Sequence, residues 1–206
     1  MPDPGLLLPG AAGSLEASGR FGGSTSSPQL SARLQGSDLQ FQDQSLQRLT
    51  AIVQAGLAAD APLQLEVELW SLQQDGQILL DSVQLAGVGT TASHQFNLQL
   101  QGLSEQVHGR LEGGLQAQQS AWHGSLSALS FNSTGYGNWK LAQAAPLALT
   151  PARVALGNAC LLGEPLISSG ESDHESARIC AGGEWSQTQG TRLESSVRTF
   201  ALVERF

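Results

Sequence analysis

The apolar residues of this chain alternate with polar residues over most of its length, and this pattern predicts β-strands. Successive side chains of a strand point to opposite faces, so a period of two gives one apolar and one polar face. The pattern begins near Leu15 and continues almost to the C-terminus. We interpret these segments as half-buried antiparallel strands, because parallel strands covered on both faces would read as continuous apolar runs. The clearest apolar series are Leu30-Ala32-Leu34, Leu63-Leu65-Val67-Leu69 and Phe96-Leu98-Leu100.

Residues 45–57 fit this pattern less clearly. Ala51 and Val53 continue a weak alternation, whereas the spacing of Leu46, Leu49 and Ile52 would also fit one face of a helix. The β-branched residues in the Thr-Ala-Ile-Val run favour a strand.

An internal repeat supports the strand prediction. The segment 23–36 (GSTSSPQLSARLQG) aligns without a gap to the segment 89–102 (GTTASHQFNLQLQG). Both copies read as turn, strand, turn. Because such a unit cannot bury its apolar face alone, it must stack on its neighbours, which predicts an elongated all-β array over residues 15–206.

The composition limits the classes of partner. The formal net charge is −8 and Lys140 is the only lysine. A basic patch for nucleic acid is therefore missing, and contact with an anionic membrane would have to come from apolar surface. No apolar run approaches the roughly 18 residues that span a bilayer, so we predict no transmembrane segment in this chain.

The N-terminal residues 1–14 are rich in Pro, Gly and Ala and show no periodicity, which predicts an irregular segment. An acidic residue, Asp3, stands where a signal peptide requires positive charge, so no export signal is visible.

The sequence offers little for catalysis. Four histidines (His94, His108, His123 and His174) lack metal-ligand spacing, and the acidic run around His174 is most simply a solvated loop. Nucleophile elbows and phosphate-binding loops are also missing. We predict no catalytic residue, no metal site and no cofactor, and hence no enzyme.

The two cysteines, Cys160 and Cys180, fit either one disulfide in an oxidising compartment or two buried thiols. Trp122 and Trp139 bracket a hairpin-like stretch and Trp185 follows the second cysteine. We interpret these rings as structural, each filling the sheet surface with its indole N–H bonded at the rim, in preference to ligand contacts.

The order of short motifs between Thr91 and Ser186 resembles the TamB family of the bacterial translocation and assembly module, an AsmA-like group of bridge proteins. The motifs are HQFNLQL from His94, LEGGL from Leu111, WHGSL from Trp122, NWKL from Asn138, PLAL from Pro146, Cys160-Leu161 and ICAGGEW from Ile179. Residues 19–85 resemble the preceding repeats of this family more loosely.

The resemblance implies a middle-to-late fragment of a periplasmic protein anchored in the inner membrane of a Gram-negative bacterium, without the family's N-terminal signal anchor or C-terminal domain. It implies a taco-like half-tube or curved sheet with an apolar concave face, a Cys160–Cys180 disulfide, and an outer-membrane β-barrel partner of the TamA type that binds parts outside this chain. Phospholipid transport between the two membranes and assembly of outer-membrane β-barrel or autotransporter proteins are the implied roles.

We expect one apolar groove to bind phospholipid acyl chains. The alternatives are a scaffold whose open strand edges pair with incoming β-barrel precursors, and a structural spacer whose apolar face is filled by its own side chains. The residues expected to line the groove are Leu30, Leu34, Leu63, Leu65, Val67, Leu69, Phe96, Leu98 and Leu100.

Overall fold

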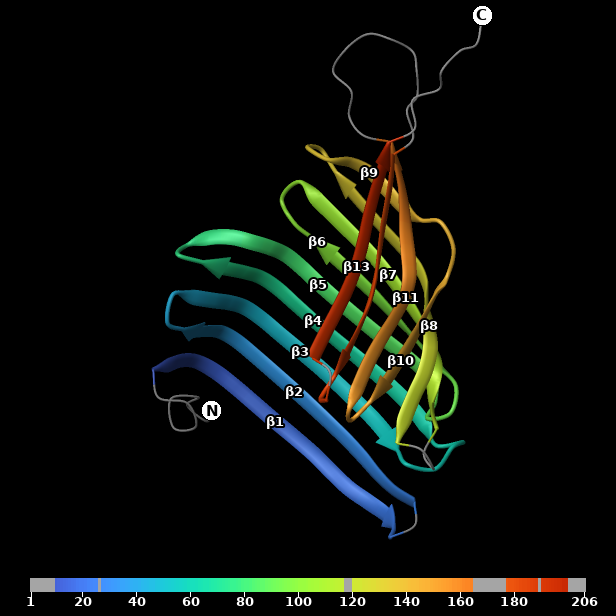
Figure 1. The fold of residues 1–206 in the computed structure, drawn as a ribbon. Coiled ribbons are helices and arrows are strands. Elements are labelled where there is room, and N and C mark those ends of the chain that lie inside the picture. Colours follow the sequence, from blue (N-terminus) through green and yellow to red (C-terminus); the bar gives the residue numbers. More distant parts are fainter. Residues whose placement is uncertain (1–9, 26, 117–119, 165–176, 189, 200–206) are drawn as a thin grey trace, which may run out of the picture. The chain divides into compact units, whose positions relative to one another are not determined.

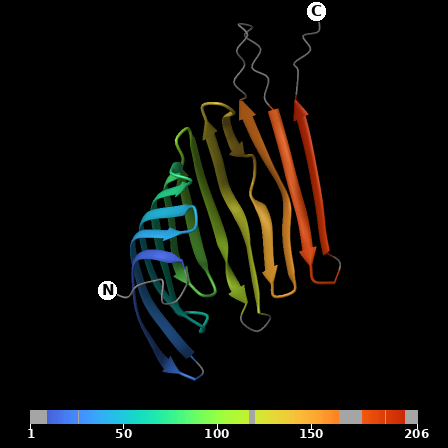
Figure 2. The same cartoon turned by 90° about the vertical axis from the view of Figure 1, so that its left-hand side faces the viewer.

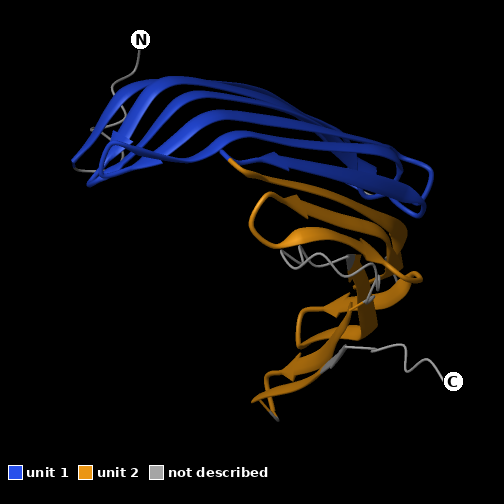
Figure 3. Cartoon of the chain, turned by 90° about the horizontal axis from the view of Figure 1, so that it is seen from above, with its two compact units in different colours: residues 1–103 blue, residues 104–206 orange. Residues whose placement is uncertain are grey.

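The computed structural model describes residues 10–25, 27–116, 120–164, 177–188 and 190–199, and every regular element in these ranges is a β-strand. The chain divides into two compact units, residues 1–103 and residues 104–206 (Figure 3). The all-β, antiparallel fold class is therefore confirmed. Within the described ranges, no helix is long and apolar enough to span a membrane.

Unit 1 is an antiparallel meander in which each strand pairs with the next one along the chain (Figure 1). The residues of its hairpin turns suit the backbone angles that these turns require. For example, Asp75 and Gly76 have φ angles of 52° and 75° between paired Gln74 and Gln77, as a two-residue hairpin turn requires. The strands are β1 (Ala11–Ser24), β2 (Ser27–Phe41), β3 (Gln44–Gly56), β4 (Pro62–Gln74), β5 (Gln77–Thr90) and β6 (His94–Gln101).

β1 begins before the periodicity at Leu15, so the predicted irregular segment was too long at its C-terminal end. Gly13 has a φ of +107°, and a shift in the β1–β2 register falls between Ala12 and Ser14. This irregularity hides the alternation although the strand continues through it. Residues 1–9 lie outside the described residues.

Unit 2 is also antiparallel, and Figure 2 shows its strands as neighbouring arrows from green to red. β9 and β10 run end to end between β8 and β11, since both pair with these two strands. The strands are β7 (Glu105–Gln116), β8 (Ala121–Ser133), β9 (Gly137–Leu141), β10 (Ala145–Thr150), β11 (Arg153–Glu164), β12 (Ala177–Ser186) and β13 (Gly190–Thr199).

The repeat seen in the sequence is a structural repeat. The offset that aligns Gly23 with Gly89 also carries both ends of β1 onto the corresponding ends of β5. The two glycines have positive φ, +87° and +141°, and a Cβ at either one would collide with the carbonyl oxygen of Ser27 or Ser93, respectively. Only glycine tolerates this approach without strain, which explains why it stands at both positions.

A side-chain hydrogen bond also repeats in the two turns. The backbone N–H of Ser27 donates to Ser24 Oγ at 3.1 Å, and that of Ser93 donates to Thr90 Oγ1 at 3.2 Å. The two hairpins are therefore built in the same way.

A row of irregular positions crosses β2, β3 and β4 and shifts the alternation in these strands. Asp38 in β2 and Ser71 in β4 have φ values of 50° and 54°, and the register places both opposite Gln47 of β3. Leu39 consequently lies on the same face as Gly36, since a Cβ on Gly36 would lie 2.8 Å from Leu39 Cδ1.

The same shift explains the helix-like spacing of residues 45–57. Leu46 and Leu49 pair with Leu72 and Leu69 of β4, so both lie on the apolar side of the sheet although they do not follow the period of two. The preference for a strand in this segment is confirmed by β3.

Candidate functional site: the apolar face of unit 1

The strand register lines up apolar side chains in rows that cross unit 1. Directly opposed residues of neighbouring strands share a face, so a chain of pairs defines a row. One complete row runs from β2 to β6 through Leu34, Ala51, Val67, Leu85 and Leu98.

All nine residues expected to line a groove lie on this face, which we call the apolar face of unit 1. Several further members were not expected from the sequence, because alanine, glycine or the shift at Gln47 interrupts the alternation around them. These are Leu15, Leu49, Val53, Val83 and Leu85.

The apolar face is not buried by the described part of unit 1. Its strands form one layer, and among the described residues of unit 1 the only buried apolar side chain is Ala61, in the loop between β3 and β4. Leu65 and Leu98 are half-buried against their lateral neighbours, and Leu30 is 44% exposed. An apolar surface in this arrangement can accept apolar ligand atoms without displacing a core.

The opposite face of unit 1 is mostly polar. Glu66 and Glu68 of β4 point there, beside residues such as Gln54, Gln84 and Gln99. Its apolar members are single side chains, for example Ile52, Trp70 and Val88. The two faces therefore differ in chemistry as the alternation predicted.

Two hairpin loops close one end of the apolar face. The backbone N–H of Thr91 donates to Ala61 O at 3.0 Å and the N–H of Ala92 donates to Ala59 O at 2.9 Å. The Thr91 hydroxyl donates to Gly56 O at 2.6 Å and the residue is 4% exposed. These bonds fix the loop between β3 and β4 against the turn between β5 and β6.

His94 belongs to the same closed end. The residue is 8% exposed, its Nδ1 donates to Thr90 O at 2.8 Å, and its ring meets Phe96 edge-on at a centroid distance of 5.0 Å. These contacts give it a structural role in the turn. Groups of three or more metal-ligating side chains are not found among the described residues.

A hollow of about 360 Å³ lies at the other end, beyond the row of irregular positions. Its walls are mostly apolar, because the shifted alternation brings Leu39, Leu46 and Leu72 together with Leu15. The apolar face thus extends from the closed loop end to this hollow.

Unit 2 carries an aromatic surface on one side of its sheet. The ring of Trp122 lies against the paired glycines Gly113 and Gly124, since a Cβ on either glycine would lie 2.5 Å from a ring atom. The ring of Trp139 lies against Gly163, and its Nε1 donates to Tyr136 O at 2.7 Å. Gly113 of the LEGGL motif and Gly124 of the WHGSL motif therefore make room for a tryptophan ring.

Trp185 differs from the other two tryptophans. The register places it on the same side of unit 2, opposite Val154, but it is 40% exposed. Trp122 and Trp139 are thus held by their contacts, whereas Trp185 presents apolar surface to solvent.

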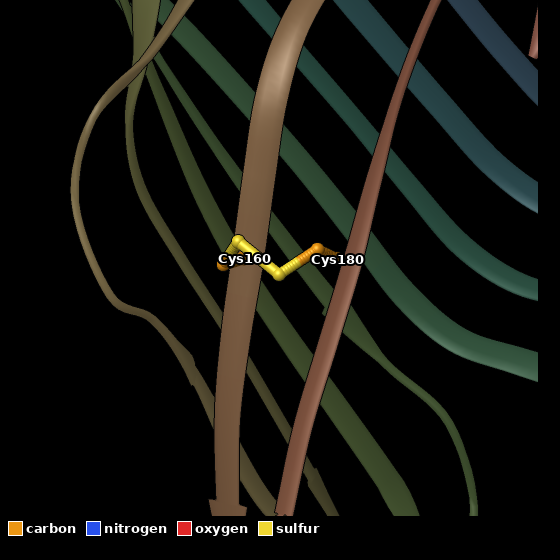
Figure 4. The surroundings of a disulfide bond; sticks show 2 residues. All are labelled: Cys160 and Cys180. Carbon is orange, nitrogen blue, oxygen red and sulfur yellow. A yellow bond between two sulfur atoms is a disulfide. The ribbon is translucent and has the colours of Figure 1, made fainter. Parts of the chain in front are cut away.

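The disulfide lies on the other side of unit 2. Cys160 of β11 and Cys180 of β12 are directly opposed, with a Cα–Cα distance of 4.0 Å, and form the bond that the resemblance implies (Figure 4). They are 1% and 8% exposed. The bond fastens two neighbouring strands and is shielded from solvent.

A groove of about 960 Å³ lies on this same side, between His123, Pro146, Gly157 and Cys180. Its charges are already paired at the rim: Arg153 makes a bidentate contact with Glu184 at 2.7 and 2.8 Å, and Arg192 lies 3.0 Å from Glu194. The hydrogen bond from Arg153 lowers the pKa of Glu184. The charged residues Glu184, Arg192 and Glu194 that line the groove thus each have a partner of opposite charge.

The sequence matches the profile described as "TamB, N-terminal domain" over residues 1–166. The chain therefore belongs to the TamB family. The match does not confirm the prediction of a middle-to-late fragment, because the matched domain is described as N-terminal. No curated protein and no solved structure matched the chain.

Proposed function

We propose that this chain is a non-catalytic part of a periplasmic bridge protein whose apolar face in unit 1 binds phospholipid acyl chains on their way between the inner and outer membranes. The observation that carries the proposal is the row of apolar side chains across β1–β6 that the described elements of unit 1 leave uncovered. Membership of the TamB family supports the location and the absence of catalysis. A buried disulfide also fits an oxidising compartment.

The dimensions of the face suit an acyl chain. Six strands give five spacings of about 4.8 Å, so a row is about 24 Å long. One leaflet of a bilayer contributes about 15 Å of hydrocarbon thickness. An extended acyl chain can therefore lie along a row.

The energy of binding is also of the right order. About sixteen methylenes removed completely from water gain roughly 13 kcal/mol, at about 0.8 kcal/mol each. A chain that contacts an open sheet on one side gains about half of this. Such binding lowers the cost of leaving a bilayer and remains weak enough for the lipid to move on.

A second candidate function is a scaffold for outer-membrane precursors. It is favoured by the edge of β1, which among the described residues pairs only with β2. On this hypothesis the ligand is an extended peptide, held by backbone hydrogen bonds at the edge.

Photo-crosslinking in cells distinguishes the two functions. Photoreactive residues at Leu65 and Leu98 lie on the apolar face, and matched controls at Glu66 and Gln99 lie on the polar face of the same strands. Lipid transport predicts phospholipid adducts at Leu65 and Leu98 and none at the controls. Adducts with precursor proteins, in the absence of phospholipid adducts, would refute it.

A further inference from the structure

A row of basic residues crosses unit 2 on the side that carries the disulfide. Leu162 and Arg178 are directly opposed, and each is two residues from a cysteine of the disulfide, so the row lies one step along the strands from that bond. Cross-strand pairs connect its members, which are His108, Ser130, Lys140, Leu162, Arg178 and Arg198. Three of the ten lysine and arginine residues of the chain lie in this basic row, and no acidic residue does.

Arg178 has a buried donor without an acceptor. Its Nε is buried and makes no hydrogen bond. The ion pairs among the described residues involve other arginines, so neither Arg178 nor Lys140 takes part in one. Burial of an N–H without an acceptor is destabilising, and a bound anion removes this cost.

The position opposite Arg178 adds a second unfavourable interaction. The β12–β13 register pairs Arg178 directly with Arg198, and like charges at opposed positions destabilise a pair of strands. An anion bound beside them offsets the repulsion. The buried donor and the pair of like charges therefore indicate the same kind of ligand.

We propose that the basic row binds a phosphate group, with Arg178 and Lys140 as the residues that contact it. These two residues lie on either side of Leu162, about 10 Å apart at two strand spacings. The guanidinium fork of Arg178 can make a bidentate contact with phosphate, and the flexible stem of Lys140 brings a point charge to the same anion. The adjacent disulfide holds β11 and β12 together at this place.

Phosphate suits this row better than a carboxylate does. A phosphate monoester carries up to two negative charges and several acceptor oxygens, whereas a carboxylate has one charge and two oxygens. Two cations without partners in ion pairs therefore match a phosphate monoester in charge.

Leu162 adds an apolar contact between the two cations. It is 45% exposed, so hydrocarbon attached close to the phosphate gains buried apolar area there. Phosphate chemistry is common to free phosphate esters and to lipid headgroups, and the experiment separates these two sources. The row lies in unit 2, so the proposal does not rest on the lipid function of the apolar face of unit 1.

The test is an NMR titration of the purified full chain with sodium phosphate. Sodium chloride keeps the ionic strength constant, because a change in screening alone would affect charged groups. We expect saturable shifts of the Arg178 Nε–H signal and of the Leu162 backbone amide signal.

Variants of the two basic residues test the contacts. Lys140→Gln should weaken phosphate binding about tenfold, the effect of one hydrogen bond between charged groups. Arg178→Lys keeps the charge but removes the fork, and it should weaken binding by a similar factor, measured at the Leu162 amide. The control Arg33→Gln removes an exposed positive charge from the polar face of β2 and should leave binding unchanged.

Two phosphate monoesters separate the sources of the ligand. Glycerol phosphate and dihexanoyl phosphatidic acid, the latter below its micelle concentration, carry the same anionic group with and without acyl chains. Tighter binding of the lipid that is abolished in Leu162→Ser assigns the row to a lipid headgroup. Equal affinities assign it to free phosphate esters.

Shifts that sodium chloride alone reproduces would overturn the proposal. Unchanged phosphate affinity in Lys140→Gln, or equal losses in Lys140→Gln and Arg33→Gln, would overturn it as well. Photo-crosslinking at Leu65 and Leu98 reports on unit 1 separately, so either proposal can fail alone.

Discussion

The substitution Leu98→Glu separates an open apolar face from a closed core. Leu98 lies in the centre of β6, opposite Leu85, and is half-buried. Full burial of a leucine contributes about 1.5–3 kcal/mol, so loss of a half-buried one costs about 1–2 kcal/mol. On an open face the new carboxylate remains hydrated, and its ionisation adds little to this cost.

A covered face predicts a different magnitude. A carboxylate forced into an apolar core loses its hydration, and the penalty is at least several kcal/mol, a large part of the stability of most domains. The two cases are therefore separated by more than the error of a denaturation experiment.

Urea denaturation followed by circular dichroism measures the difference. We expect Leu98→Glu to remain folded, with a free energy of unfolding about 1–2 kcal/mol below wild type, and to lose binding of a fluorescent phospholipid. The control Gln99→Glu, at the next position and on the polar face, should keep both stability and binding. A Leu98→Glu protein that is unfolded without urea would refute the open face and favour a spacer filled by its own side chains.

Three further predictions concern unit 2. Replacement of both Cys160 and Cys180 by alanine should lower the free energy of unfolding by about 3 kcal/mol, because the bond closes a loop with a sequence separation of 20 residues; an unchanged urea midpoint would contradict this. Gly124→Ala should cost about 1–3 kcal/mol, since the new Cβ meets the Trp122 ring and the backbone of Glu112, whereas Gly22→Ala, with open space at its Cβ, is the neutral control in the same denaturation assay. Arg153 lowers the pKa of Glu184, so the stabilisation of the fold by this ion pair is present above the unfolded-state pKa of the carboxyl and is lost as the pH falls towards the folded-state value. An NMR titration should place the titration midpoint of Glu184 lower in wild type than in Arg153→Gln. Equal midpoints would contradict the interaction.

The period of two predicted the fold class because an antiparallel sheet with one polar face requires apolar and polar residues to alternate along each strand. The nine residues expected in a groove share one face for the same reason. At Asp38 and Ser71, however, positive φ values shift the alternation, and the spacing of apolar residues changes from two to three. The shift includes Gln47 of β3, which lies opposite both residues, so β3 resembled a helix and Leu39, Leu46 and Leu72 were not expected on the apolar face.

Other features depend on contacts between strands that cannot be predicted from the sequence pattern. Gly113 and Gly124 lie on the two strands of one hairpin, and the β7–β8 register brings them together against the ring of Trp122. The exposure of Thr25 and the burial of Thr91 differ although the residues are identical, because a neighbouring loop reaches only the second. The repeat could show that the two turns are alike, but not what each one touches.

The most direct test of the open lipid-binding face is an NMR experiment with the purified chain and a phospholipid that carries a spin label in its acyl chain. The account predicts that methyl signals of Leu30, Leu65 and Leu98 broaden as the lipid is added. The methyl signals of Val88, which is 57% exposed on the polar face, should keep their width. Equal broadening of Val88 and Leu98, or no broadening of either, would contradict the account.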